Sequence, residues 1–279
     1  MSTLAPPPPA FLAALAAEAA HPWADAPVIY FDETTSTNDV ALRLASEGAV
    51  EGTSVVALAQ TAGRGRRGRT WTSPPGAGVY FTVILRPSPT ASGEGGASSR
   101  LTLIAAVAAA DAIERVSGVS PQIKWPNDLV IDRGRDAHGA WQRRKLAGIL
   151  TEGAVAGGAI QHVVVGIGIN LEPTNYPPDV AATSLAAEAG GNPGPARVFA
   201  ACRARLAIEH ANWRASGWAD IAHRWRERSP SSEGYRVRWA DASHEIEGVS
   251  AGLDPDGALR ITDATGRLHR IVSGEVLWE

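Results

Sequence analysis

The chain has 279 residues, enough for a large and a small domain, and its formal net charge of −3 argues against nucleic acid as the main partner. Its one cysteine, Cys202, excludes an internal disulfide and suits a reducing compartment. Residues 1–26 carry no lysine or arginine, which a secretory signal needs, and the apolar run 101–110 is too short to cross a bilayer. We therefore expect a cytoplasmic protein without membrane segments.

Polar side chains crowd the start of the first predicted helix. A strand is expected over 28–32 and the helix over 39–46, and between them lies the row Ser36-Thr37-Asn38. One of these side chains is expected to cap the helix. Three adjacent polar groups exceed what a cap needs, so the spare donors at this helix N-terminus predict a site for the polar head of a ligand.

The segment 60–71, which follows a strand predicted over 53–59, mixes arginine with glycine. Its residues include Gln60, Gly63, Arg64, Gly65, Arg66, Arg67, Gly68, Arg69 and Trp71. Guanidinium groups match phosphate and carboxylate oxygens, and glycines let backbone N–H groups approach closely. The segment is therefore predicted to be a mobile cationic loop that gains order by closing on a phosphate-bearing ligand.

Three other interpretations of this loop stay open. Its glycines match the dinucleotide-binding pattern, but Thr-Trp-Thr-Ser-Pro-Pro follows where a helix should begin. An Arg/Gly run also occurs in nucleic-acid-binding segments, although these usually belong to basic chains. The loop could also be a solvated charged segment that binds nothing.

The next predicted turn would present polar groups at one end of a sheet. A strand is expected over 78–85, a loop over 86–99 and a helix over 101–116. Two further strands are expected over 122–125 and 128–132. The turn between the last two strands carries Lys124, Asn127 and Asp128. Asp128 could hold Mg²⁺, orient Lys124 or stabilise the turn, and we favour one of the last two roles.

Only Lys124 and Lys145 are lysine among 26 basic residues. An ammonium is a compact point charge that the broad guanidinium fork of arginine cannot replace in a small pocket. We therefore predict a functional role for Lys124 and treat Lys145 as a second candidate. The alternative is the chance survival of surface lysines.

Glycines interrupt two later strands. After a polar surface loop expected over 133–144, strands are predicted over 146–151 and 162–169. They contain Gly148, Gly166 and Gly168. Glycine weakens a strand and normally marks a bulge or a close approach, so we predict a flat apolar floor for a slim ligand. Glycines packed under a helix are the alternative.

The end of the chain predicts a small β-domain. Helices are expected over 196–213 and 218–228, and short strands over 235–239, 245–253, 258–262 and 268–272. These strands would form a small barrel packed on the larger domain. We divide the chain into a flexible or partly helical tail (1–26), a catalytic domain (27–230) and a C-terminal barrel (231–279). No P-loop lysine, zinc cluster or nucleophile elbow is present, so no residue suggests covalent catalysis.

These motifs, in this order, resemble those of biotin protein ligases, also called biotin–[acetyl-CoA-carboxylase] ligases. The motifs are Ser36-Thr37-Asn38, Gln60 with Gly63–Arg69 and Trp71, Lys124–Asp128, Lys145–Leu150, and Gly166–Asn170. The resemblance implies an α+β fold, with a mixed β-sheet flanked by helices and a small C-terminal SH3-like β-barrel. It also implies a short bacterial form without the N-terminal DNA-binding domain.

The resemblance implies a two-step ligase that uses Mg²⁺ and ATP. Biotin would become biotinyl-5′-AMP and then be transferred to a lysine of the biotin carboxyl carrier protein of acetyl-CoA or a related carboxylase. Lys124 and Arg66 would be catalytic. Biotin would be held by Ser36, Thr37, Asn38, Gln60, Arg64, Gly65, Arg66, Lys124, Gly148, Gly166 and Gly168. ATP would be held by Arg64, Arg66, Arg69, Trp71, Lys124, Asn127 and Asn170, with Trp71 stacked on adenine.

Two features depart from the family pattern, and two other functions remain as alternatives. Few residues and little positive charge precede the first strand, so we expect no DNA binding, and either a monomer or a homodimer is compatible with the sequence. No basic residue follows Gly274-Glu275, which leaves open a phosphate contact from the barrel. The alternatives are a lipoate or octanoate ligase or transferase, against which the polar row argues, and an Arg/Gly-loop nucleic-acid-binding protein.

Overall fold

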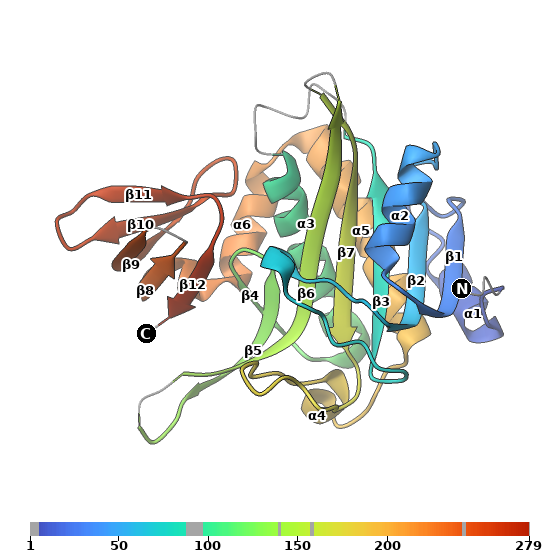
Figure 1. Cartoon of the computed structure of the whole chain (residues 1–279), viewed down its shortest axis with the longest axis horizontal. Coiled ribbons are helices and arrows are strands. Elements are labelled where there is room, and N and C mark those ends of the chain that lie inside the picture. Colours follow the sequence, from blue (N-terminus) through green and yellow to red (C-terminus); the bar gives the residue numbers. More distant parts are fainter. Residues whose placement is uncertain (1–5, 88–96, 139–140, 157–158, 242–243, 279) are drawn as a thin grey trace.

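A seven-stranded mixed sheet forms the centre of the molecule (Figure 1). The computed structural model describes residues 6–87, 97–138, 141–156, 159–241 and 244–278. The strands are β1 (Val28–Thr34), β2 (Ser54–Gln60), β3 (Gly78–Leu85), β4 (Gln122–Lys124), β5 (Asp128–Arg135), β6 (Trp141–Ala156) and β7 (Ala159–Asn170). Their order is β1-β2-β3-β7-β6-β5-β4; β1 and β2 are parallel, and the other pairs are antiparallel. The predicted mixed sheet is confirmed.

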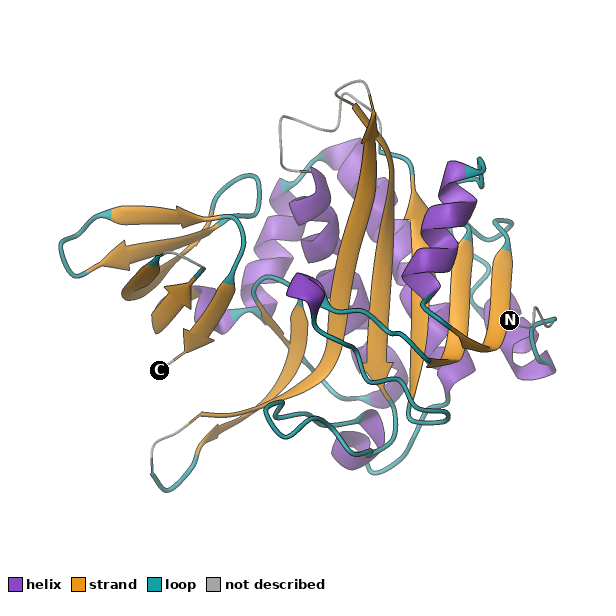
Figure 2. Cartoon of the chain, viewed as in Figure 1, coloured by secondary structure: helices purple, strands orange, loops and turns teal. Residues whose placement is uncertain are grey.

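Helices cover the two faces of this sheet unequally (Figure 2). The helices are α1 (Pro9–Ala17), α2 (Thr37–Ser46), α3 (Ala97–Ser117), α4 (Leu185–Ala189), α5 (Pro195–Ser216) and α6 (Ala219–Arg228), with short 3₁₀ turns at Arg66–Gly68 and Pro230–Ser232. Alternate residues of β3, such as Phe81 and Val83, join the large core with α3 and α5, whereas Ile84 packs with Ala41 and Ala45 of α2. α2 covers only part of its face of the sheet.

The segment before β1 packs against the sheet domain. Phe11 of α1 lies 5.1 Å from the Tyr30 ring and 6.0 Å from the Phe199 ring, measured between centroids. Phe11 and Trp23 are buried. The sequence predicted a loose or partly helical tail; α1 supplies the helix, and the two aromatic side chains attach the segment to the core.

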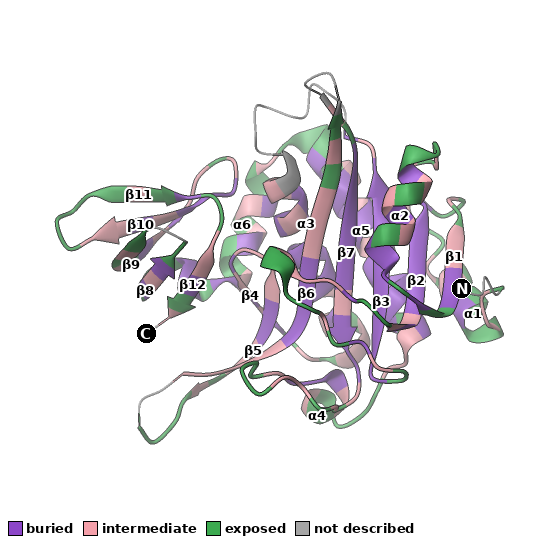
Figure 3. Ribbon diagram, in the orientation of Figure 1, coloured by how far each residue is buried: buried purple, intermediate pink, exposed green. Residues whose placement is uncertain are grey.

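The prediction of a polar surface loop over 133–144 is wrong, because β5 and β6 form a hairpin there. β5 continues to Arg135 and β6 begins at Trp141, with Arg135 opposite Trp141 in the ladder. Exposed positions near the end of this hairpin are visible in Figure 3. A hairpin that extends beyond the core buries neither face fully, so its sequence lacks the apolar alternation on which the prediction relied.

A second, antiparallel sheet follows α6. Its strands are β8 (Glu233–Ala240), β9 (Glu245–Leu253), β10 (Leu259–Asp263), β11 (Leu268–Ile271) and β12 (Glu275–Trp278), in the order β11-β10-β9-β8-β12. Val237 and Val276 are buried in the same core as the large sheet. The predicted small β-domain thus exists as an open sheet in the described strand pairs, and the sequence missed β12 and α4. No helix of the described residues is long and apolar enough to cross a membrane.

Candidate active site

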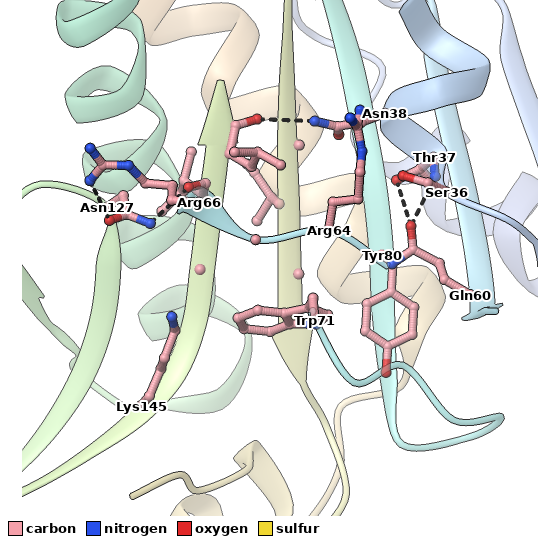
Figure 4. A pocket seen from close by; sticks show the side chains of 17 residues that line it. Ser36, Thr37, Asn38, Gln60, Arg64, Arg66, Trp71, Tyr80, Asn127 and Lys145 are labelled. Carbon is pink, nitrogen blue, oxygen red and sulfur yellow. Dashed lines mark hydrogen bonds between the residues drawn. The ribbon is translucent and has the colours of Figure 1, made fainter. Parts of the chain in front are cut away.

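Most of the predicted biotin-binding residues lie around one small pocket on the α2 side of the large sheet (Figure 4). Its cavity volume is about 60 Å³. The predicted residues that line it are Ser36, Thr37, Asn38, Gln60, Arg64, Gly65, Arg66, Trp71, Asn127, Gly148, Gly166 and Gly168. The pocket also includes Lys145 and Tyr80. Tyr80 was not predicted from the sequence. It lies in β3 two residues before Thr82, so the two side chains are on the same face of the sheet.

The side chain of Gln60, rather than that of Ser36, accepts a hydrogen bond from the backbone at the start of α2. Gln60 Oε1 accepts hydrogen bonds from the Thr37 backbone N–H (2.9 Å) and from the Thr37 hydroxyl (3.2 Å), and Gln60 Nε2 donates to Ser73 Oγ (3.0 Å). The side chain of Ser36 makes no capping hydrogen bond. The predicted cap by one of the three row residues is therefore wrong, because a side chain from β2 reaches the free N–H group first. The buried Ser36 hydroxyl is left at the pocket wall.

The amide of Asn38 is held between three elements. Its Nδ2 donates to Glu152 Oε2 of β6 (2.7 Å), and its Oδ1 accepts from the Thr82 hydroxyl of β3 (2.6 Å). A methyl group added to Gly166 would come within 2.1 Å of Asn38 Oδ1. Gly166 thus permits a helix to approach the sheet, which was the alternative interpretation of this glycine.

The indole of Trp71, labelled in Figure 4, lies in the pocket, and the other two glycines are in contact with it. A Cβ atom on Gly148 or on Gly168 would come within 2.7 Å of the Trp71 ring. The indole Nε1 is buried without a hydrogen-bond partner among the described residues. The Trp71 ring thus occupies the place at these two glycines where a slim ligand was predicted to lie.

Three arginines attach the loop 61–71 to α2, β6, the β4–β5 turn and β12. Arg64 pairs with Asp39 of α2 (2.8 Å) and Glu152 of β6 (2.7 Å). Arg66 donates to Asn127 Oδ1 (3.0 Å) in the β4–β5 turn, and burial lowers its pKa. Arg69 pairs with Glu275 of β12 (2.6 Å). The loop was predicted to be mobile until it bound an anion; here carboxylates and an amide of the protein hold it over the pocket.

The two lysines have different partners. Lys145 Nζ pairs with Asp128 Oδ1 (2.7 Å), whereas no carboxylate oxygen of the described residues lies within 4.0 Å of Lys124 Nζ. Of the two roles favoured for Asp128, a direct contact that orients Lys124 is therefore excluded, although Lys124 and Asp128 are opposite each other in the β4–β5 ladder. Burial lowers the pKa of Lys124, and the nearby carboxylates of Asp128 and Glu275 oppose that shift.

Lys124 lines a larger neighbouring cavity of about 420 Å³. Of the predicted ATP-binding residues, those that line it are Arg66, Arg69, Trp71, Lys124, Asn127 and Asn170. Arg64 does not line this cavity; it lines the small pocket and a third cavity formed with Asp39 and Glu152. The two cavities share Gly65, Arg66, Trp71, Asn127 and Lys145, so they meet under the loop. The large cavity is also lined by Glu275 and Trp278, which a prediction confined to the catalytic domain could not place there.

Asn170 has a structural contact at the edge of the large cavity. Its Nδ2 donates to the Thr183 carbonyl oxygen (2.9 Å), and the side chain is buried. This bond joins the end of β7 to the segment that precedes α4. The backbone of that segment in turn pairs with Lys145.

The described residues contain no group of three or more His, Cys, Asp or Glu side chains arranged to hold a metal ion. Asp128 and Asp179 line the large cavity. Mg²⁺ that arrives with a nucleotide is bound mainly by phosphate oxygens and water, with one or two carboxylates from the protein. The side chains present fit that mode of binding, in which Asp128 or Asp179 would complete the coordination.

Comparisons with known proteins agree on one family. Residues 28–170 match the biotin/lipoate A/B protein ligase family. The bifunctional ligase/repressor BirA of Bacillus subtilis is 34% identical over 253 residues, which cover 89% of this chain and 73% of the relative. A biotin–[acetyl-CoA-carboxylase] ligase of Paracoccus denitrificans is 35% identical over 251 residues, which cover 84% and 93%. The structure of biotin protein ligase from Aquifex aeolicus in complex with biotin and ATP is similar with a TM-score of 0.73, at 25% identity over 91% of this chain and 98% of that one.

Proposed function

The chain belongs to the biotin/lipoate A/B protein ligase family, and we propose that it activates biotin with ATP and transfers it to a carrier protein. The observation that carries this proposal is the junction of two unlike cavities under one arginine loop. The small one combines the neutral hydrogen-bonding side chains of the polar row and Gln60 with three cations, Arg64, Arg66 and Lys145. The large one is lined by more cations, among them Lys124, Arg69 and Arg143. Such a pair suits a reaction that joins a neutral ring bearing a carboxylate to a polyanionic nucleotide.

The first step joins two anions. An oxygen of the biotin carboxylate attacks the α-phosphorus of ATP, the bond to the β-phosphate oxygen breaks, and pyrophosphate leaves with the bonding electron pair. Negative charge on the phosphoryl oxygens is stabilised by fixed cations. Lys124 and Arg66 line the cavity where this charge would develop. In the second step the amine of a carrier lysine attacks the acyl carbon, and AMP leaves.

The small pocket would bind the ureido ring of biotin. The Ser36 hydroxyl at its wall can donate or accept a new hydrogen bond, while the Thr37, Asn38 and Gln60 side chains are already oriented by one another, by Thr82 and by Glu152. A buried ureido group would be selected strongly, because an analogue without it leaves its partners unpaired.

Trp71 must leave the glycine floor before biotin can bind. The pocket volume of about 60 Å³ is far below the roughly 300–1,000 Å³ of ordinary ligand sites. Removal of the indole would expose Gly148 and Gly168, on which the ring of biotin would lie. The displaced indole would then be free to stack on adenine, which unites the two roles predicted for this part of the site.

The large cavity would hold the phosphates of ATP. Arg66, Arg69, Asn127 and Lys124 supply donors, and Asn170 fixes the cavity edge through Thr183. Arg64 would act through the loop, since two carboxylates already engage it. The acceptor would be the biotin carboxyl carrier protein of acetyl-CoA or a related carboxylase. We further propose a cytoplasmic enzyme that acts as a monomer or homodimer and does not bind DNA.

Exchange of labelled pyrophosphate into ATP tests the first half-reaction. Exchange that requires biotin, and that lipoate and octanoate do not support, is expected. Exchange with the linear acids instead would reassign the chain to the lipoyl branch of the family. Absence of exchange with every acid would remove the proposed function. Labelling of a purified carrier domain by the same preparation tests the second half-reaction.

A further inference from the structure

Cations and aromatic rings alternate between the β5–β6 hairpin and the catalytic lysine. The Arg135 guanidinium carbon lies 4.3 Å from the Trp141 ring centroid, and that of Arg143 lies 3.9 Å from the same ring. Arg143 also lies 4.1 Å from the ring of Trp278, and Lys124 Nζ lies 5.7 Å from that ring. We call this series, Arg135, Trp141, Arg143, Trp278 and Lys124, the cation–aromatic ladder.

The ladder joins three separate parts of the chain. Arg143 is held in place by Asp132 (3.0 Å) within the hairpin, and Trp278 pairs with Val237 in the second sheet. Tyr235 of β8 lies on the same side, with its ring 5.7 Å from the Trp141 ring. Cation–aromatic contacts are effective within about 6 Å, and more so when water is excluded. The last strand of the small sheet is therefore fixed against the hairpin, and its terminal tryptophan faces Lys124.

Lys124 depends on this ring because its nearest carboxylates are engaged elsewhere. Asp128 pairs with Lys145, and Glu275 pairs with Arg69. An ammonium with a carboxylate partner would have to exchange that partner for substrate. One that rests on an aromatic face keeps its N–H donors available for two anionic oxygens at once.

From this arrangement we infer that Trp278 is a positioning residue for Lys124 in adenylate formation, held in place by Arg143 and Trp141. The inference rests on the proposed function. It assigns to the small C-terminal sheet a role in the first half-reaction that neither the basic-residue pattern nor the catalytic-domain motifs indicate. The ring orients the ammonium and keeps water from it, and the reacting oxygens approach from the opposite side.

The test compares Trp278→Ala and Trp278→Phe in biotin-dependent pyrophosphate exchange, with Trp218→Ala as the matched control. Trp218 is partly buried against the core outside the ladder. Trp278→Ala should lower kcat about fivefold to tenfold, which corresponds to the loss of one largely desolvated cation–aromatic contact. Trp278→Phe should recover most of this loss, and Trp218→Ala should leave kcat unchanged.

The pH profile separates positioning from simple docking of the sheet. The groups whose charges act on Lys124 are Asp128, Glu275, Lys145 and Arg143, and burial lowers its pKa most. Exchange needs the protonated amine, so activity is lost as the pH rises through that lowered pKa. Trp278→Ala removes a ring that favours the ammonium, which alone would lower the pKa, but it also admits water to a group whose pKa is lowered most by burial. Relief of desolvation is the larger effect, so the alkaline limb should move to higher pH.

Two results would overturn the inference while the wild-type protein still exchanges pyrophosphate with biotin. One is an unchanged kcat in Trp278→Ala. The other is an equal loss in the Ala and Phe variants with the alkaline limb unmoved, which would assign Trp278 to docking alone. If the wild-type protein itself shows no biotin-dependent exchange, the proposed function fails instead, so the two failures are distinguishable.

Discussion

The two cavities under the arginine loop differ in how their polar groups are satisfied. Around the small pocket, the hydroxyls and amides of Thr37, Asn38, Gln60 and Thr82 bond to one another in a buried network. Around the large cavity, partly exposed cations pair with carboxylates of other elements: Arg69 with Glu275, and Lys145, which lines both cavities, with Asp128. A buried neutral network is rigid and selects by shape and hydrogen bonding, whereas exposed ion pairs exchange readily for other charges.

This contrast separates the expected effects of mutation. Changes in the network should alter the apparent affinity for biotin and leave the chemistry intact. Changes among the cations should alter the rate of adenylation or the retention of its product. A variant that departed from this separation would weaken the contrast between the two cavities.

Lys124→Arg should lower biotin-dependent pyrophosphate exchange about 100-fold to 1,000-fold, the scale of losing one fixed electrostatic group. The charge is kept, but the broad guanidinium fork cannot take the place of a point charge on the Trp278 ring. Lys145→Arg is the matched comparison. Its loss should be smaller, because Asp128 can bind a guanidinium as well as an ammonium. A near-wild-type rate for Lys124→Arg would disprove the argument from the scarcity of lysine.

Arg66→Gly should still form the adenylate but release it about 10-fold to 100-fold faster, as expected when a charged hydrogen-bonding group is removed. Arg66 holds the loop to Asn127, between the two cavities. The measurement is the biotinylation of lysines on an added bystander protein, compared with labelling of the carrier. Tight retention with unchanged carrier selectivity would exclude this role for Arg66.

Features of these two regions that are encoded by neighbouring residues could be predicted from the sequence, whereas contacts between residues far apart in the chain could not. β3 was predicted with its observed limits, Gly78–Leu85, because a buried strand is encoded by its own apolar residues. The pocket residues of the polar row, Gln60 and the glycine strands were identified from local motifs. Their mutual contacts were not, since Gln60 and Thr37 meet only when β2 ends beside the start of α2.

Pairings that depend on register escaped prediction. Asp128 binds Lys145 rather than Lys124, and the β5–β6 ladder that brings them together contains a register shift between Leu129 and Val130. A bulge of this kind cannot be counted from sequence spacing. Likewise, β12 is a strand of four residues, and three other strands lie between it and its partner, β8, in the sequence. Short strands at a chain end carry too little pattern to be recognised without their partner.

Thr82→Val tests the neutral network. The isosteric change removes the hydroxyl that donates to Asn38 Oδ1 and leaves that buried acceptor with one partner fewer. The KM for biotin should rise about threefold to tenfold with kcat unchanged, since a single hydrogen bond contributes roughly 0.5–1.5 kcal/mol. Thr102→Val is the matched control, because Thr102 bonds to Thr151 beneath the other face of the sheet. A fall in kcat with an unchanged KM for biotin would contradict the assignment of this network to biotin binding.

Glu275→Gln should have the smallest effect on rate, less than about threefold, because its ion pair with Arg69 is largely exposed to solvent and salt. Its informative effect concerns pH. The Glu275 carboxylate raises the pKa of Lys124, so its removal lowers that pKa further, and exchange should be lost at a lower pH than in the wild-type protein. This shift is opposite to the one expected for Trp278→Ala, in which water reaches the ammonium. Glu47→Gln breaks an equally exposed pair with Arg43 on α2 and should leave the profile unchanged. If both β12 variants moved the alkaline limb in the same direction, charge and desolvation would not act separately on Lys124, and the limb would have to belong to another group.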